Sequence, residues 1–333
     1  MLGIKLGLGV NSIVKSLSSE LQALITSLFG NGEQGAIYVP KPLVNGTQSL
    51  FQDSAGTVLV TADGDPDGLT IDQSPNSINA SQSTSAARPT YNANPDRLSL
   101  DKVDDALIIT VPTGGWNGTM VLATDDGTAS YGISIPAGAY ELGQKSKSNK
   151  FFPGTAIVGA LFRDGALTAD EKADVESYFV DNGATASYGA VTNFTEYWRF
   201  LRVTRFPLIN TSSGVVFYRT WESSIDFIIF PLLDFSSAEI LGRAWNQCSQ
   251  LIDFPENSFD NVKGGDFGGA FISTNLSEAS IDGILVSLVT SGIATGTRVF
   301  DQSGGSAPSV GTGQPAIDTL RSRGWTVSVT GGY

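Results

Sequence analysis

Two consecutive segments of the chain match when one is written beneath the other: residues 206–229 read FPLINTSSGVVFYRTWESSIDFII, and residues 230–253 read FPLLDFSSAEILGRAWNQCSQLID. Phe-Pro begins each segment and begins a third at Phe254-Pro255, and a tryptophan recurs as Trp221 and Trp245. A fixed period of this kind, 24 residues here, is typical of stacked repeats. Because one unit cannot bury its apolar face alone, we expect each to be one coil of a short solenoid.

The repeat extends in both directions. The third unit carries two extra residues, which bring Phe271 to the position of Trp221, and Trp198 lies about one period upstream. These aromatic side chains would share one azimuth of the stack. They are expected either to pack in the core or, if exposed, to form a ladder that stacks on sugar rings. The candidate ligand-binding residues are Trp198, Trp221, Trp245 and Phe271.

The C-terminal segment offers a cap for such a stack, which needs closed ends. Residues 278–289 predict a helix with Ser277 as N-cap and Gly292 as its stop. A second short helix is expected over 316–323, and a final strand over 325–329.

The N-terminal helix, expected over residues 12–29, carries an apolar stripe. The stripe could pack on the next domain of the same chain, pair with other copies in a short trimeric coil, or dock in a larger assembly. Two heptads are too few to be stable alone, because isolated helices below about 15 residues are marginal in water. We expect this helix to anchor a homotrimer through Ile13, Leu17, Leu21, Leu24 and Leu28.

The middle of the chain predicts β structure. Residues 31–91 are rich in Gly, Ser, Thr, Asn, Asp and Pro, which indicates an extended connector or the first strands of the next domain. Residues 92–190 contain strand patterns and end in a helix whose capping box is Thr168 and Glu171, so a small antiparallel β-sandwich is expected. The predicted fold is mainly β with α, divided into an anchoring helix (1–30), a connector (31–91), a sandwich (92–190) and a repeat solenoid with cap (191–333).

Composition excludes several classes of function. The 333 residues include no His and one Cys, so histidine-dependent catalysis, cysteine zinc sites and a disulfide framework are excluded. A net charge of −13 argues against a nucleic-acid partner. No stretch reaches the roughly 20 apolar residues of a membrane span, and Lys5 interrupts the apolar start, so neither membrane insertion nor a secretory signal is expected. The basic cluster Lys145, Lys147 and Lys150 is interpreted as a solvated loop.

Carboxylate and thiol groups give no catalytic, metal or cofactor assignment. Asp63, Asp65 and Asp67 begin like a calcium loop, but position twelve is Ser74, so a turn between strands is expected. The pairs Asp104-Asp105 and Asp125-Asp126 could suggest a glycosidase, but adjacent strand residues point to opposite faces. Cys248 is interpreted as a small buried apolar residue.

Several blocks resemble parts of tailed-bacteriophage virion proteins. SLFQDSAGT (49–57), VTADGDP (60–66) and AARP (86–89) resemble a block that in those proteins precedes a concanavalin-like jelly-roll domain. LFRDGALT (161–168) and the helix after it are similar to the closing segment of such domains. The Phe-Pro units with NLS (275–277), ILVSL (284–288) and RGWTV (323–327) resemble degenerate leucine-rich repeats of phage fibres and bacterial surface proteins.

The resemblance implies a non-enzymatic structural protein of the virion, of tail or head fibre type. Its expected partners are other virion proteins, further copies of itself and a host-surface glycan or protein. Residues 92–150 are short for a full jelly roll, so the concanavalin-like region would be reduced. The alternatives are a carbohydrate-binding surface module without catalysis and a carboxylate-based polysaccharide depolymerase.

Overall fold

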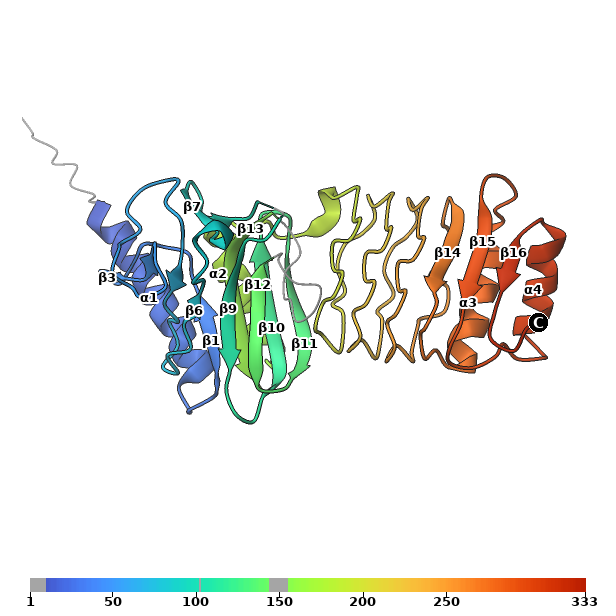
Figure 1. The fold of residues 1–333 in the computed structure, drawn as a ribbon, viewed down its shortest axis with the longest axis horizontal. Helices are drawn as coiled ribbons and strands as arrows, with labels where there is room; N and C mark the ends of the chain where they lie inside the picture. Colours follow the sequence, from blue (N-terminus) through green and yellow to red (C-terminus); the bar gives the residue numbers. More distant parts are fainter. Residues whose placement is uncertain (1–9, 102, 144–154) are drawn as a thin grey trace, which may run out of the picture.

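The computed structural model describes residues 10–101, 103–143 and 155–333, with side chains of the first helix described from Glu20 onward. Within these residues the expected mainly β fold with helices is confirmed: four α-helices accompany several antiparallel sheets. The molecule is elongated, with a two-sheet body, a row of coils and a C-terminal cap (Figure 1). Lys145, Lys147 and Lys150 lie outside the described residues.

The larger sheet of the body has the strand order β11-β10-β13-β8-β7, and β1 pairs with β13 beside that path. Both faces of this sheet are buried. Along β10, Met120 and Leu122 belong to the main core, whereas Val121 and Ala123 belong to a second cluster beneath the helices. The strands are β1 (Gly35–Tyr38), β7 (Thr90–Ala93), β8 (Asp96–Ser99), β10 (Trp116–Thr124), β11 (Thr128–Ile135) and β13 (Ala156–Asp164).

A smaller antiparallel sheet, in the order β12-β9-β6-β5-β4, shares the main core with the larger one. Leu50 and Ile109 from the smaller sheet join the same cluster as Met120 and Phe162 from the larger sheet. The strands are β4 (Leu50–Phe51), β5 (Leu69–Thr70), β6 (Ala80–Ser81), β9 (Ala106–Val111) and β12 (Gly138–Gly143), with β2 (Leu43–Val44) and β3 (Thr47–Gln48) as a separate hairpin.

Residues 31–91 form the first strands of these sheets, which confirms the second expected alternative, and the assignment of an extended connector is wrong. Strand β1 pairs with β13, and β6 pairs with β9. Between the strands, the Asp72 carboxylate accepts hydrogen bonds from the backbone N–H groups of Ile37 and Ile78, each at 2.9 Å. Strands only two residues long show no alternating pattern, so sequence periodicity cannot distinguish them from loop.

Helix α2 (Ala169–Asp181) covers the outer face of the larger sheet, and its predicted capping box and buried face are confirmed. The Thr168 hydroxyl accepts from the N–H of Glu171 at 3.2 Å, and the Glu171 carboxylate accepts from the N–H of Thr168 at 2.7 Å. Gly159 in β13 leaves space for the Phe179 ring, because a Cβ at this position would lie 2.1 Å from the ring. The helix can therefore pack closely on the sheet.

Helix α1 (Val10–Phe29) contacts α2 and shares its cluster. Leu21, Leu24 and Leu28 are 3%, 7% and 0% exposed and pack with residues of β10 and β13. Their assignment to anchoring or oligomerisation is therefore wrong, because the chain's own sheet and helix cover this part of the stripe. The side chains of Ile13 and Leu17 lie outside those described. No helix of the described residues is long and apolar enough to cross a bilayer.

Beyond the body, successive segments stack as coils joined by parallel backbone bridges (Figure 1). The backbone N–H of Trp198 donates to the carbonyl of Thr220 at 2.8 Å, and one coil further the backbone N–H of Trp221 donates to the carbonyl of Ala244 at 2.8 Å. The spacing of these contacts follows the sequence period. Two rows of bridges run along the stack, through Asn193, Val216, Ile240 and Asp266 and through Arg205, Ile229 and Asp253.

The first coil joins the body at β11, an edge strand of the larger sheet. Arg205 forms an antiparallel bridge with Gly132, and the Thr204 N–H donates to the Gly132 carbonyl at 3.0 Å. Beside this bridge, the indole N–H of Trp198 donates to the Tyr131 hydroxyl at 3.2 Å. An exposed edge strand is a site for unwanted pairing, so the coil both covers it and continues the main core.

The C-terminal end of the stack carries the two helices and the strand predicted there. Ser277 caps helix α3 (Glu278–Ser291) by accepting from the N–H of Ser280, and Gly292 ends it with a left-handed φ of 70°. Helix α4 (Gly313–Ser322) packs against α3. A parallel sheet completes the cap with β14 (Gly265–Phe271), β15 (Arg298–Gln302) and β16 (Thr326–Ser328).

Candidate functional site

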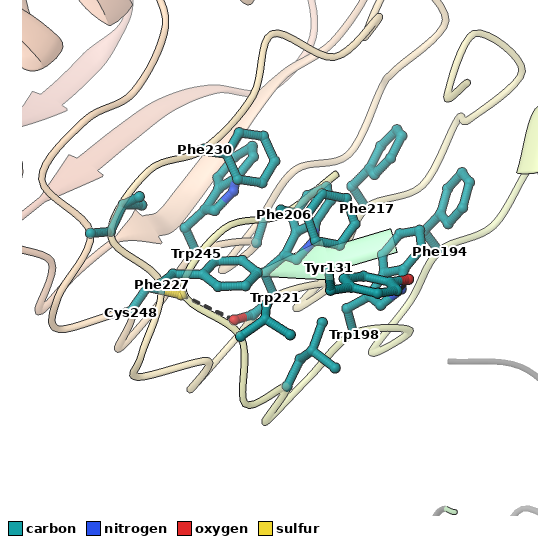
Figure 2. Packing of buried hydrophobic residues seen from close by; sticks show 14 of the residues in the cluster. Tyr131, Phe194, Trp198, Phe206, Phe217, Trp221, Phe227, Phe230, Trp245 and Cys248 are labelled. Carbon is teal, nitrogen blue, oxygen red and sulfur yellow. Dashed lines mark hydrogen bonds between the residues drawn. The ribbon is translucent and has the colours of Figure 1, made fainter. Parts of the chain in front are cut away.

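The repeated aromatic residues lie inside the coils (Figure 2). Trp198, Trp221, Trp245 and Phe271 are each 0% exposed, and we call them the aromatic column. Their rings stack with centroids 5.7, 5.1 and 4.9 Å apart and interplanar angles of 7°, 10° and 3°. Their assignment as ligand-binding residues is therefore wrong, because a ring buried between two others cannot stack on a sugar.

A second column, formed by the Phe-Pro phenylalanines, packs edge-on against the first. Phe230 lies 5.8 Å from Phe206 and 5.1 Å from Phe254 in stacked pairs. It meets Trp221 at 4.9 Å and 81°. Aromatic pairs of this kind stabilise by about 0.5–1.5 kcal/mol beyond their buried area. The coils thus hold one another through shape-specific ring contacts.

The predicted burial of Cys248 is confirmed, and its thiol has a repeat-equivalent partner. Its Sγ donates to the Trp221 carbonyl at 3.1 Å, as the Ser224 hydroxyl donates to the Trp198 carbonyl at 2.9 Å in the preceding coil. Burial raises the pKa of the Cys248 thiol well above its ordinary value. The thiol is therefore a structural donor rather than a nucleophile.

Each coil turns at two backbone positions with left-handed φ, between 56° and 66°. For a residue with a Cβ this conformation costs about 1–2 kcal/mol, so the surrounding contacts must hold it. The turns direct charged side chains onto one outer face of the stack. The positions are Glu196 and Phe200, Arg219 and Ser223, Arg243 and Gln247, and Gly269 and Ser273 in successive coils.

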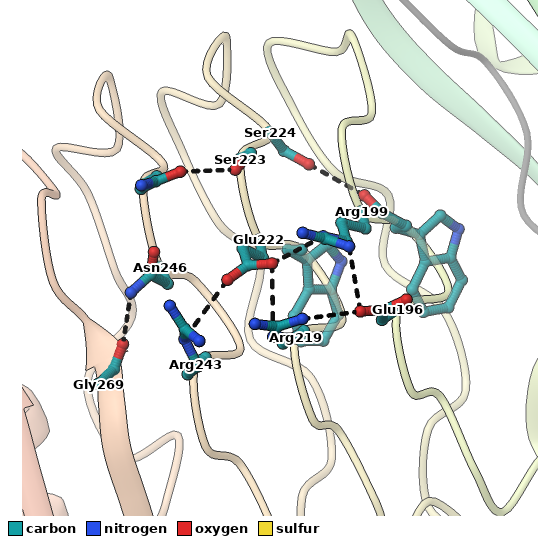
Figure 3. Close-up of polar contacts among 12 residues, drawn as sticks. Glu196, Arg199, Arg219, Glu222, Ser223, Ser224, Arg243, Asn246 and Gly269 are labelled. Carbon is teal, nitrogen blue, oxygen red and sulfur yellow. Dashed lines mark hydrogen bonds and ion pairs between the residues drawn. The ribbon is translucent and has the colours of Figure 1, made fainter. Parts of the chain in front are cut away.

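The outer face of these turns carries an ion-pair ladder, formed by Glu196, Arg199, Arg219, Glu222 and Arg243 (Figure 3). The Glu222 carboxylate contacts the Nε atoms of Arg199 at 2.7 Å, Arg219 at 3.6 Å and Arg243 at 3.5 Å. The Glu196 carboxylate contacts Arg199 at 3.1 Å and Arg219 at 3.2 Å. Both carboxylates are therefore committed to guanidinium groups from more than one coil.

The two carboxylates of the ladder differ in exposure: the Glu222 side chain is 4% exposed and that of Glu196 is 42% exposed. Desolvation makes a buried carboxylate costly unless it is paired, whereas exposed pairs contribute little. The hydrogen bond that Arg219 donates to the Glu196 carboxylate raises the pKa of Arg219. With three cations and two anions, the ladder carries a small net positive charge.

Sequence reasoning missed this ladder, although one signal was present. Arg219 and Arg243 each lie two residues before a tryptophan of the repeat. The pairing of these arginines with Glu196, and of Arg199 with both carboxylates, was harder to predict, because Glu196 and Arg199 belong to the incomplete upstream unit.

The three aspartates of the calcium-like motif bind different segments, which confirms the interpretation as a turn. Asp65 accepts from the backbone N–H groups of residues 61–62 at 2.8 and 2.9 Å, and Asp63 accepts from a backbone N–H of β7 at 2.9 Å. Asp67 accepts from the hydroxyl of Thr70. Burial raises the pKa of Asp67 to about 7.

The acid pairs have structural partners of their own. Asp125 accepts from the N–H of Ala156 at 2.9 Å, and Asp126 accepts from the Tyr197 hydroxyl. Carboxylate oxygens of Asp101, Asp104 and Asp105 lie within 4.8 Å of one another, but Asp105 accepts from the N–H of Asp101 at 2.8 Å and so closes its own loop. These contacts explain the acids as loop and turn stabilisers.

Comparison of the chain with protein-family models, curated proteins and solved structures found no match. Function has to be inferred from the fold and its surfaces.

Proposed function

We propose that this chain is a non-enzymatic structural component of a tailed-bacteriophage virion, of tail or head fibre type, that contributes to host-surface attachment. In finer terms, the body is a reduced concanavalin-like β-sandwich, and the coils are a leucine-rich-type solenoid with a C-terminal cap. The two sheets with a common core and the parallel bridges between coils support this description.

The observation that carries the proposal is the continuity of the core. One cluster of buried residues extends from Leu50 in the smaller sheet, through the aromatic column, to Val329 near the C-terminus. Interiors packed in this way deform little, so the parts of an elongated molecule keep their relative positions (Figure 1). A fibre that presents a surface away from a particle needs this property.

The test is immunogold electron microscopy of purified particles from the phage that encodes the chain, with antibodies raised against the 333-residue protein. Label on tail or head fibres is expected. Antibody preabsorbed with the protein is the control. Purified particles without label and without the chain by mass spectrometry would contradict the proposal.

We also propose assembly with other virion proteins and as a homotrimer. Because Leu21, Leu24 and Leu28 are buried within the chain, a trimer would use other surfaces. Multi-angle light scattering should give three times the mass of the 35.0 kDa chain. A monomer at every concentration, alone and in the presence of the neighbouring virion protein, would overturn the trimer.

The non-enzymatic part is tested with host surface polysaccharide and a reducing-end assay. No sustained release of ends is expected, because the acid pairs stabilise turns and loops. Sustained turnover would favour the depolymerase instead. Saturable binding without turnover would support the carbohydrate-binding module, a second candidate favoured by the groove described next.

A further inference from the structure

A groove of about 430 Å³ lies where the body meets the first coil. Its walls come from strand β11, helix α2, residues 186–188 and the coil segment 207–210. Neither region forms it alone. Pockets for small ligands commonly occur at such boundaries and have volumes of about 300–1,000 Å³.

Polar groups of the groove combine fixed positions with unused hydrogen-bonding capacity. Ser130 donates to Oε1 of Glu176 at 2.6 Å, which orients that carboxylate and leaves its Oε2 without a partner among the described residues. The Asn210 carbonyl oxygen accepts from the hydroxyl of Ser212 at 2.8 Å, so its Nδ2 remains a donor. Lys172 lines the same groove. One acceptor and two donors therefore face a common space.

The coil side supplies an apolar surface. Leu208 follows the first Phe-Pro pair and is 77% exposed. Pro207 and Ile209 lie beside it in the same lining. An apolar surface opposite polar groups suits a ligand that has C–H faces and hydroxyl edges.

Charge narrows the class of ligand. Among the lining residues the charged side chains are Lys172 and Glu176, which cancel. The chain as a whole has a net charge of −13 and repels polyanions. Hydroxyl groups both donate and accept hydrogen bonds, so a neutral polyhydroxyl ligand matches the donors and the acceptor present.

We propose that this groove binds one neutral hexose-type unit of a glycan. Glu176 would accept from a hydroxyl, Lys172 and Asn210 would donate, and Leu208 would contact the ring C–H face. This inference rests on the proposed attachment role only for the source of the glycan, a host surface, and not for the binding itself.

The test is saturation-transfer NMR and titration of the full chain with glucose, galactose, N-acetylglucosamine, maltose and lactose, with glucuronate as the acidic probe. At least one neutral probe should bind. Glu176→Ala and Leu208→Glu should each weaken that binding about tenfold or more, the effect of losing one hydrogen bond to a charged group or a major apolar contact.

The matched control is Leu232→Glu, which changes the residue at the same repeat position one coil further on, 52% exposed and outside this groove. It should leave binding unchanged. Thermal unfolding of all three variants checks that the fold persists. Binding of no neutral probe, preference for glucuronate, or equal loss in Leu232→Glu would each overturn the proposal.

Failure here is distinguishable from failure of the proposed function. If particles carry gold label on their fibres but the isolated chain binds no sugar, only the proposal about the groove is overturned. Sugar binding by a chain absent from particles would remove only the virion role.

Discussion

The two-sheet body and the stacked coils share one hydrophobic core but close it in different ways. In the body, strands far apart in sequence pair, as β1 does with β13, and helices seal the second face. In the coils, each segment contacts mainly the next, and identical positions repeat the same contact. We therefore expect a destabilising substitution in the body to affect distant strands, and one in the stack to affect mainly the neighbouring coils.

The largest expected effect is in the middle of the aromatic column. Trp221→Ala should lower the free energy of unfolding by about 3–5 kcal/mol, because it leaves a cavity between two rings. Trp221→Phe should cost far less, since Phe271 already forms an equivalent rung and the indole N–H of Trp221 has no acceptor among the described residues. Equilibrium denaturation measures both. Equal losses in the two variants would show that ring stacking does not hold the coils.

The matching experiment in the body is Leu28→Ala, which should cost about 3 kcal/mol at a fully buried position. The oligomeric state should not change. Leu43→Ala, at a side chain that is 60% exposed, is the control and should have little effect. Denaturation and light scattering are measured together, and loss of a trimer with unchanged stability would restore the anchoring role of the helix.

Asp65 and Asp67, two carboxylates close together in the body, are expected to affect stability in opposite ways as pH changes. Because the pKa of Asp67 is raised to about 7, above the roughly 3.9 of an unfolded chain, the folded state keeps a proton that the unfolded state releases. Its contribution to stability therefore falls as pH rises from about 4 to about 7, by about 1.4 kcal/mol for each pH unit between the two pKa values. Asp67→Asn should remove this slope in thermal unfolding across that range.

Asp65 is the control, because its pKa is shifted in the opposite direction to that of Asp67. Hydrogen bonds from the backbone of residues 61–62 lower its pKa, so its contribution is present above the unfolded pKa and is lost on acidification. Asp65→Asn should weaken the protein near neutral pH and leave the Asp67 slope in place. The same slope in wild type and Asp67→Asn would refute the assignment.

The ion-pair ladder gives a smaller effect that depends on burial. Glu222→Gln should cost about 2 kcal/mol, because it leaves guanidinium groups without their buried counter-ion. Glu196→Gln removes the same charge at an exposed position and should cost about 0.5 kcal/mol or less. Denaturation at low and high salt measures both, and equal costs would mean that burial of Glu222 is unimportant.

The smallest effect is expected for Cys248→Ser. Ser224, at the equivalent position of the preceding coil, already donates to the tryptophan carbonyl above it. The change should therefore stay within about 1 kcal/mol, less than a typical polar substitution in a core. Cys248→Leu is the contrast, since it adds volume to a packed site and removes the donor. A Ser variant as unstable as the Leu variant would show that the two coils are not equivalent.

The same comparison explains what could be predicted from the sequence. The spacing of Phe206, Phe230 and Phe254 identified equivalent residues in the coils, and the capping box at Thr168 identified a helix, because both signals are local. The short strands β4 and β6, and the pairing of β6 with β9, left no local pattern. Long-range pairing, rather than propensity, defines that part of the body.

The candidate sites follow the same division. Periodicity placed Trp198, Trp221, Trp245 and Phe271 at one azimuth, but it could not tell the inside of a coil from the outside. The groove at the junction was invisible for another reason: Glu176 is on a helix of the body and Leu208 is in a coil, and they line one groove because the first coil packs on β11, where Gly132 pairs with Arg205.

The 24-residue offset between the units that begin at Phe206, Phe230 and Phe254 has a consequence for the evolution of length. Loss of residues 230–253 would place the coil that begins at Phe206 directly against the one that begins at Phe254, with the same pair of ring types in contact. In-frame duplication would add a coil by the same geometry. A lineage could therefore adjust the reach of this molecule in whole steps while inheriting both of its ends unchanged.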